Sequence, residues 1–158
     1  LFRSAAMKLA TEEWNAVFDW FVNGWLPARN IVKESLGGAV EVHPSGQIVV
    51  LTRYCPWKEH LLQLEECAGI SGRTKYLLLE DEISKKWRIN AVPVKCGSFG
   101  DRLSLPEEWR GLRDEELSTK AGIKDCTFIH RSGFTGGNAS YEGVLAMAVE
   151  ALRIGEAL

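Results

Sequence analysis

The stretch SGFTGGNASYEG, residues 132–143, constrains the fold of this chain more than any other segment. It follows the short apolar run CTFIH and precedes YEGVLAMAVEAL, in which apolar residues recur at helical spacing. The sequence therefore predicts a strand at 126–130, a glycine-rich loop, and a helix over about 140–156. Asn138 or Ser140 is expected to cap that helix, because both residue types accept hydrogen bonds from its first backbone amides.

Two helices and a hairpin are predicted at the start of the chain. Helical spacing of apolar residues favours helices over 2–22 and about 26–36, the second beginning at Pro27 and ending at the glycine pair 37–38. A PSG turn signal between AVEVH and QIVVLTR predicts a β-hairpin over 39–53.

The middle of the chain predicts a helix, a second hairpin and a short helix. A helix begins after Pro56 and runs through WKEHLLQLEEC, and the strands TKYLLLE and WRINAVPV are joined by the charged turn DEISKK. Residues 95–106 are expected to be irregular, and PEEWRG to form one helical turn. RDEELSTKAG then predicts a helix that stops at Gly122.

These elements predict an α+β (mixed α/β) fold, with a mixed sheet of about five strands flanked by helices. Residues 1–158 suit a single domain, large enough to need no disulfide or metal for stability. No apolar run approaches the roughly 18 residues of a membrane span. The chain opens with LFRSAAMKLA, without an initiator Met or a signal-peptide pattern, so we expect it to be a piece of a longer protein.

Charge and cysteine patterns exclude some classes of function. The net charge is −2, from 19 basic and 21 acidic residues that are well mixed, so a basic face for duplex nucleic acid would have to arise through folding. The cysteines are scattered with no CxxC pair, and the histidines are not spaced as zinc ligands. Free thiols in a reducing compartment are the simpler interpretation.

The glycine-rich stretch is the strongest candidate for a binding site. A helix N-terminus exposes unpaired amides that favour phosphates and carboxylates, and glycines at 136 and 137 allow such a group to approach closely. The order GGN matches neither a P-loop nor GxGxxG. The alternative is a tight, well-capped connection that binds nothing, and the residues alone leave both interpretations open.

Other candidates each have a simpler structural alternative. His130 and Ser132 lie beside the glycines but are also typical of a hydrogen-bonded turn. The remaining candidates suit ordinary solvated or ion-paired charges equally well, and they are Lys58, His60, Arg110 and Arg113. No Asp and His residues have the spacing of a hydrolytic metal site, and no Ser or Cys lies in a nucleophile elbow. The residues therefore give little support for catalysis by this chain alone.

Several segments together resemble a known family. In chain order they are WLPAR (25–29), CPWKEHL (55–61), WRINAVPV (87–94), RLSLPEEWRGLRDEEL (102–117) and FIHRSGFTGGNASYEGVLAMA (128–148). They closely resemble the C-terminal half of the melanocyte-proliferating-gene exonucleases, which are related to the DHH phosphoesterases and were once described as metal-dependent protein hydrolases. The resemblance extends through nearly the whole chain in the same order.

The resemblance implies a 3′–5′ RNA exonuclease whose divalent metal, manganese or magnesium, is bound in an N-terminal half. This chain would then be the substrate-binding domain, similar to the DHH-associated C-terminal domain, with no metal of its own and no membrane association. Its partners would be RNA or a nucleotide and its own N-terminal half, with a homodimer also possible. The implied location is the nucleus and mitochondrion for a eukaryotic protein and the cytoplasm for a prokaryotic one.

The resemblance also implies which residues bind substrate. Gly136 and Gly137 match the family's glycines, and Asn138 stands where the family commonly has His, which favours positioning of the substrate over proton transfer. The other implied contacts are His130, Ser132, Arg110, Arg113, Lys58 and His60. Arg29 either adds a contact or ties the first helices to the core. A non-catalytic phosphate- or nucleotide-binding module, or an assembly domain, is the alternative function.

Overall fold

The structure is a computed structural model that describes residues 2–157, with side chains from Ser4 onward. Leu1 and Leu158, the ends of the predicted domain, lie outside the described residues. The elements, in chain order, are α1 (Phe2–Asp19), the π-helix η1 (Trp20–Trp25), α2 (Leu26–Gly37), α3 (Ala39–Val42), β1 (Ile48–Val50), α4 (Lys58–Cys67), β2 (Tyr76–Glu80), β3 (Trp87–Ala91), the 3-10 turn η2 (Glu107–Trp109), α5 (Asp114–Ala121), β4 (Cys126–Ile129), β5 (Thr135–Asn138) and α6 (Tyr141–Glu156).

The strands form one five-stranded mixed sheet in the order β1-β2-β3-β5-β4. Strand β1 pairs in parallel with β2, and all the other neighbours are antiparallel. The predicted α+β fold with a mixed sheet flanked by helices is confirmed. The predicted hairpin that joins β2 to β3 is also confirmed, with register running from Tyr76↔Ala91 to Glu80↔Trp87.

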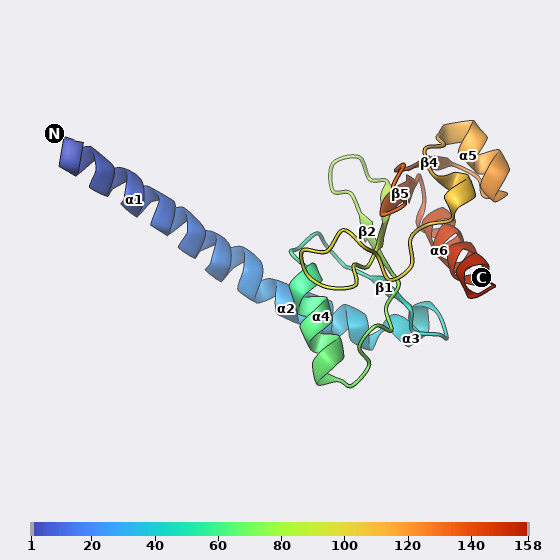
Figure 1. Ribbon diagram of the computed structural model, residues 1–158, viewed down its shortest axis with the longest axis horizontal. Coiled ribbons are helices and arrows are strands. Elements are labelled where there is room, and N and C mark those ends of the chain that lie inside the picture. The colour runs from blue at the N-terminus through green and yellow to red at the C-terminus, as the bar shows by residue number, and fades with distance from the viewer. Residues whose placement is uncertain (1, 158) are drawn as a thin grey trace.

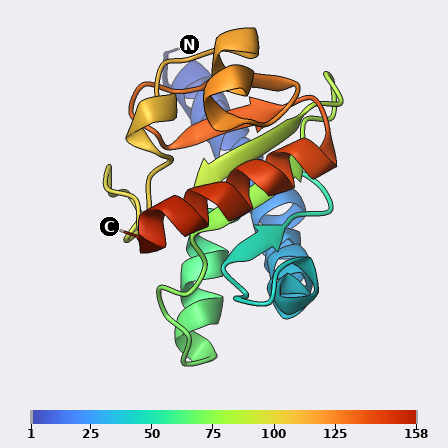
Figure 2. The ribbon, with the colours of Figure 1, turned by 90° about the vertical axis from the view of Figure 1, so that its right-hand side faces the viewer.

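Helix α6 covers one face of the sheet, as Figure 2 shows. Alternate strand residues such as Tyr76, Leu78 and Ile89 point to this face and are fully buried. They pack against an apolar stripe of α6 that includes Val144 and Met147. This packing follows from the two-residue period of a strand meeting the helical period of α6.

The opposite face of the sheet is covered over only part of its width. Helices α2 and α4 pack over β1 and β2, where they bury Val49, Leu77 and Leu79. On β3, β5 and β4 the side chains of the same face remain partly or fully exposed; they are Arg88, Asn90, Thr135 and Phe128. We call this uncovered part the open sheet face.

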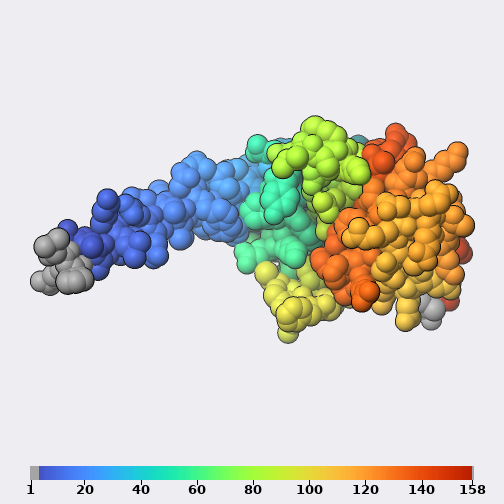
Figure 3. Space-filling model, turned by 90° about the horizontal axis from the view of Figure 1, so that it is seen from above, coloured from blue at the N-terminus to red at the C-terminus, as the bar shows by residue number. Residues whose placement is uncertain are grey.

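Helices α1, η1 and α2 follow one another without a break, and α1 projects away from the rest of the fold (Figures 1 and 3). All of its described side chains, from Ser4 to Asp19, are exposed. The helices predicted over 2–22 and 26–36 are therefore present, but the first does not pack on the sheet. No helix among residues 2–157 is long and apolar enough to cross a membrane.

The hairpin predicted over 39–53 is wrong. Residues Ala39–Val42 form the short helix α3, and only Ile48–Val50 is a strand. The Gln47 carbonyl accepts from the amides of Lys75 and Tyr76, which aligns β1 in parallel with β2. The alternating pattern AVEVH also suits one helical turn, in which Ala39 and Val42 lie three residues apart on one side.

The glycine-rich loop is also wrongly placed by the sequence. Residues 130–133 form the turn, and Thr135–Asn138 is an inner strand between β3 and β4. A Cβ at Gly136 would overlap the Ile129 side chain and lie 2.8 Å from the Phe128 carbonyl oxygen. The glycines are therefore required because neighbouring strands approach closely, a strand role that composition alone does not distinguish from a loop.

Candidate functional site

Gly136 and Gly137 lie in a strand that is paired on both sides. In the register, Gly136 is opposite Ile89 and Ile129, and Gly137 is opposite Arg88 and Phe128. Both residues are buried. Their amides therefore belong to the sheet. The prediction from the sequence, that these amides are exposed to bind a phosphate, does not match this position.

Gly137 has a different consequence, for the side chains beside it. It sits on the open sheet face, and its missing side chain leaves space between Arg88 on β3 and Phe128 on β4. The Arg88 guanidinium carbon lies 5.6 Å from the centre of the Phe128 ring. That of Arg113, at the start of α5, lies 5.9 Å from the same ring centre. Two exposed guanidinium groups thus converge on one half-buried ring, a geometry typical of cation–π contact.

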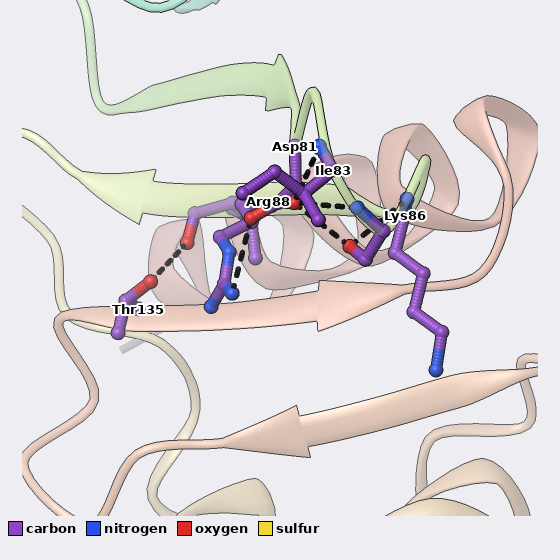
Figure 4. Close-up of polar contacts among 7 residues, drawn as sticks. Asp81, Ile83, Lys86, Arg88 and Thr135 are labelled. Atoms are coloured by element: carbon purple, nitrogen blue, oxygen red, sulfur yellow. Dashed lines mark hydrogen bonds and ion pairs between the residues drawn. The ribbon is translucent and has the colours of Figure 1, made fainter.

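An acidic turn fixes the position of Arg88. Asp81 Oδ2 lies 3.4 Å from Arg88 Nη2, and Asp81 Oδ1 accepts hydrogen bonds from the Ser84 amide and hydroxyl, as Figure 4 shows. The hydrogen bonds from Ser84 are the main reason that the pKa of Asp81 lies below its ordinary value, with smaller help from Ile83 and Arg88. The carboxylate therefore stays ionised and holds one side of the guanidinium, which leaves its other N–H groups free to bind an anion.

A pocket lies where the α4 side of the fold meets the open sheet face. Its volume is about 440 Å³, and its lining includes Tyr54, Trp57 and Lys58 on one side and Arg88 and Asn90 on the other. Tyr54 is 68% exposed, whereas Trp57 is buried and lies 5.8 Å below Lys58 Nζ. The pocket thus offers an accessible aromatic ring, two cations and an amide within one space.

Other predicted residues gather at the edge of the sheet where β4 ends. His130 Nδ1 and Ser132 Oγ lie 2.8 Å apart in the exposed turn after β4. Arg110 donates from Nε to the Leu105 carbonyl at 2.9 Å and lies against Gly133 in the same turn. These residues are therefore neighbours, as predicted, although a ligand at this edge stays a prediction.

Asp101 lies in the irregular segment before η2 and accepts a hydrogen bond from Ser104 Oγ at 3.1 Å. Burial raises the pKa of Asp101, and the positive charges of Lys58 and Arg110 partly oppose that rise, as does a hydrogen bond from Ser104. Lys58 and Arg110 therefore both act on one carboxylate, although they are distant in the sequence. The sequence did not indicate Asp101, because a single Asp in an irregular segment carries no recognisable pattern.

Asn138 lies at the other end of β5, inside the core. It is fully buried, donates from Nδ2 to the Lys124 carbonyl at 2.8 Å, and accepts from the Ser140 amide at 3.0 Å. The cap of α6 is Ser140, whose hydroxyl accepts from the Gly143 amide at 3.0 Å. Asn138 thus holds the entry to α6 in place, and the edge with His130 is the length of β5 away.

His60 and Arg29 connect helices. His60 is fully buried, with Nε2 2.9 Å from the Trp25 carbonyl and its ring centre 4.2 Å from that of Trp25. The prediction that His60 extends the binding surface beside Lys58 is therefore wrong. Arg29 donates to Gln63 Oε1 at 3.2 Å, which joins α2 to α4. This contact matches the alternative in which Arg29 ties the first helices to the core.

The described residues do not fit a catalytic metal centre. Among residues 2–157, no group of three or more His, Cys, Asp or Glu side chains is placed to hold an ion. Asp81, the acid that contacts Arg88, is already engaged by Ser84 and Arg88. No catalytic step through a metal is therefore assigned to these residues, and the metal expected in another part of the protein stays a prediction.

The fold and the site together define an α+β domain with a partly uncovered sheet face, on which Arg88 and Arg113 meet at Phe128 beside an acidic turn. Residues 2–152 match the model of the MYG1_exonuc family, described as "Uncharacterised protein family (UPF0160)". The chain belongs to this family, and the resemblance found in its sequence is confirmed.

Three relatives illustrate the match. The MYG1 protein of Dictyostelium discoideum is 46% identical over 147 residues, which cover 93% of this chain and 44% of that protein. The MYG1 exonuclease of Homo sapiens is 46% identical over 145 residues, 90% of this chain and 38% of that protein. MYG1 protein YER156C of Saccharomyces cerevisiae is 45% identical over 143 residues, 88% of this chain and 42% of that protein. No solved structure shows a significant match.

The matches cover only part of each relative. The chain spans less than half the length of the relatives it matches, between 38% and 45%. The activity of a whole protein of this family is therefore a proposal for this chain.

Proposed function

We propose that this chain is the substrate-binding part of a metal-dependent 3′–5′ RNA exonuclease of the DHH phosphoesterase type. The remainder of the protein, outside this chain, would supply the metal and the cleavage. The observation that carries the proposal is the convergence of Arg88 and Arg113 on Phe128, beside a pocket with Tyr54 and Lys58. The exonuclease names of several relatives support the reaction class.

The open sheet face suits a single strand of RNA. Guanidinium groups bind phosphate oxygens in a forked geometry, and exposed aromatic rings stack on bases whatever their sequence. Arg88 and Arg113 supply the first kind of contact and Tyr54 the second. A net charge of −2 does not exclude this role, because a local meeting of two guanidinium groups at Phe128 can bind phosphate although acidic residues border the same face.

The same face also has an acidic border. Glu80, Asp81 and Glu82 line the pocket on the side of the β2–β3 turn. Carboxylates repel a phosphate backbone, so the RNA backbone would run on the side of Arg113 and the bases would enter the pocket. The proposal thus assigns a direction across the sheet as well as a surface.

Partners and location follow from the resemblance. The proposed partners are RNA or a nucleotide and the protein's own catalytic half. The proposed location is the nucleus and mitochondrion for a eukaryotic source or the cytoplasm for a prokaryotic one. The proposal for the binding face does not depend on these partners or on this location.

Digestion of single-stranded RNA by the full-length protein tests the reaction. With manganese present, an oligonucleotide labelled at its 5′ end should shorten progressively from the other end, and chelation should stop the reaction. This chain alone should bind the same RNA without cutting it. Early release of the 5′ label, or cleavage by the isolated chain, would overturn the assignment. Binding without any cleavage by the full-length protein would favour the non-catalytic module.

A further inference from the structure

Helix α1 and the start of η1 carry a stripe of large apolar side chains that is exposed in the described chain. We define the α1 stripe as Met7, Trp14, Val17, Phe18 and Phe21, all of which are exposed, Trp14 to 70%. Soluble proteins rarely leave a continuous apolar surface of this kind in water. In folded proteins most of the stability of a helix comes from packing of one amphipathic side, which α1 lacks in the described chain.

The stripe has the spacing of a buried helix face. Met7, Trp14 and Phe21 recur at seven-residue intervals and therefore lie almost in line, while Val17 and Phe18 flank that line. The other side carries mainly polar and charged side chains, with Leu9 as an exposed apolar exception, and there Lys8 Nζ lies 3.8 Å from Glu12 Oε1. The helix is therefore amphipathic, with one side suited to water and one suited to an apolar partner.

The stripe continues into the folded body. Phe21 stacks on Trp25 with ring centres 5.0 Å apart, and Trp25 packs on the buried ring of His60. The contact between His60 Nε2 and the Trp25 carbonyl also holds the end of η1 against α4. The base of the projecting helix, which Figure 3 shows extending from the folded body, is thus anchored by these contacts.

We propose that the part of the full-length protein outside this chain packs on the α1 stripe. The matched relatives have more than half of their length outside the shared region, which provides enough chain for such a partner. Covalent connection would also give that partner a high effective concentration at the helix. The inference does not depend on RNA or on exonuclease activity.

A second copy of the chain fits the stripe less well. In a two-fold symmetric, antiparallel pair centred on the stripe, Trp14 would face Trp14 of the partner helix on the axis. Helices pack with axes about 8–10 Å apart, and close approach at the crossing favours small side chains there. An unrelated surface with a recess for the Trp14 indole has no such restriction.

Docking on the stripe would also affect the substrate-binding side. A second pocket, of about 280 Å³, is lined by Trp20 and Trp25 of η1 together with Tyr54, Trp57 and Lys58. Tyr54, Trp57 and Lys58 also line the pocket beside the open sheet face. A partner on the stripe would therefore lie next to the proposed RNA site, and the two parts would form its walls together.

Hydrogen exchange of the full-length protein without RNA tests this inference. Amides of residues 7–19 should exchange roughly 100-fold more slowly there than in this chain alone, measured where light scattering shows both to be monomeric. The Trp14→Glu variant should lose that protection in the full-length protein, while Glu12→Gln, on the charged side, should keep it. Since Trp14 is 70% exposed in this chain, Trp14→Glu should leave the melting temperature of the isolated chain almost unchanged.

Two results would overturn the inference. One is equal exchange of residues 7–19 in the full-length protein and the isolated chain, which would show that the stripe is not covered. The other is protection that appears only as the mass doubles with concentration, which would identify a second copy as the occupant.

Discussion

The Arg88 guanidinium lies 5.6 Å from the centre of the Phe128 ring, with Gly137 between them in the sheet. Gly137, one of the two glycines that first suggested a phosphate loop, therefore leaves room for an arginine on the open sheet face. A Cβ at Gly137 would lie 2.9 Å from the Trp87 carbonyl oxygen and 2.8 Å from Thr127 Oγ1. Bulky substitutions there would disturb the sheet itself, so the function is better tested at the exposed side chains.

Tyr54→Ala should weaken RNA binding by the full-length protein without changing its stability. Tyr54 is exposed at the pocket mouth, and loss of one base–aromatic stack costs about 1–3 kcal/mol, or roughly 5- to 150-fold in affinity. Fluorescence anisotropy with a short single-stranded RNA measures the change. Phe99→Ala is the control, because Phe99 is an even more exposed aromatic residue that does not line that pocket. Equal effects of both variants would contradict a specific role for Tyr54.

Asn138→Ala should destabilise the fold by about 2–3 kcal/mol, because it removes two hydrogen bonds of a buried side chain and leaves a small cavity. The bonds are those to the Lys124 carbonyl and from the Ser140 amide. Urea unfolding measures the loss. Asn15→Ala, at an exposed position of α1, should change stability very little. If the Asn138→Ala protein is stable but no longer binds RNA, Asn138 contacts the substrate, as the sequence resemblance implied.

Glu65→Gln should be strongly destabilising. Glu65 is fully buried, its Oε2 lies 2.6 Å from Arg102 Nη1, and its Oε1 accepts from the Thr74 amide at 2.7 Å. Loss of its charge leaves Arg102 buried without a counter-ion, which costs about 3–5 kcal/mol. Glu150→Gln breaks the exposed pair with Arg153 and should cost about 0–1 kcal/mol. Similar unfolding midpoints for both variants would contradict this account.

Asp101→Asn should stabilise the protein at neutral pH. Burial raises the pKa of Asp101 above 3.8, so the folded state favours the protonated acid, and the stability associated with this group is lost as pH rises through the raised pKa. Asn cannot ionise, yet its carbonyl still accepts from Ser104. Urea unfolding from pH 3 to 8 should show an advantage for the variant at high pH that disappears below pH 3.8. An advantage that grows as pH falls would have the wrong sign.

Elements with clear local periodicity were predictable from the sequence. The α4, α5 and α6 helices and the β2–β3 hairpin follow from helical or two-residue spacing with turn residues between them. Strand β1 was not found as part of a parallel pair, because its partner β2 is distant in the sequence and the pattern AVEVH suits either structure. Strand β5 was missed because glycines lack the side chains on which strand prediction depends.

The site was only partly predictable for a similar reason. Lys58 and Arg113 were identified by residue type, but their relation to Phe128 and Tyr54 depends on strand order. Arg88 was missed, although the alternation in WRINA places it and Asn90 on the side opposite Ile89. That alternation was the available signal for a polar sheet face. The structure shows that no helix among residues 2–157 covers this face, which the sequence alone does not reveal.

The salt dependence of RNA binding tests the central claim most directly. The full-length Arg88→Ala/Arg113→Ala variant should bind single-stranded RNA at least about tenfold more weakly than the unmodified protein, and its slope of log affinity against log salt should be shallower by about 1.4, or about 0.7 for each lost phosphate contact. Arg153→Ala, on the exposed side of α6, is the control. Affinity and slope indistinguishable from those of Arg153→Ala would contradict the open sheet face as the RNA-binding surface.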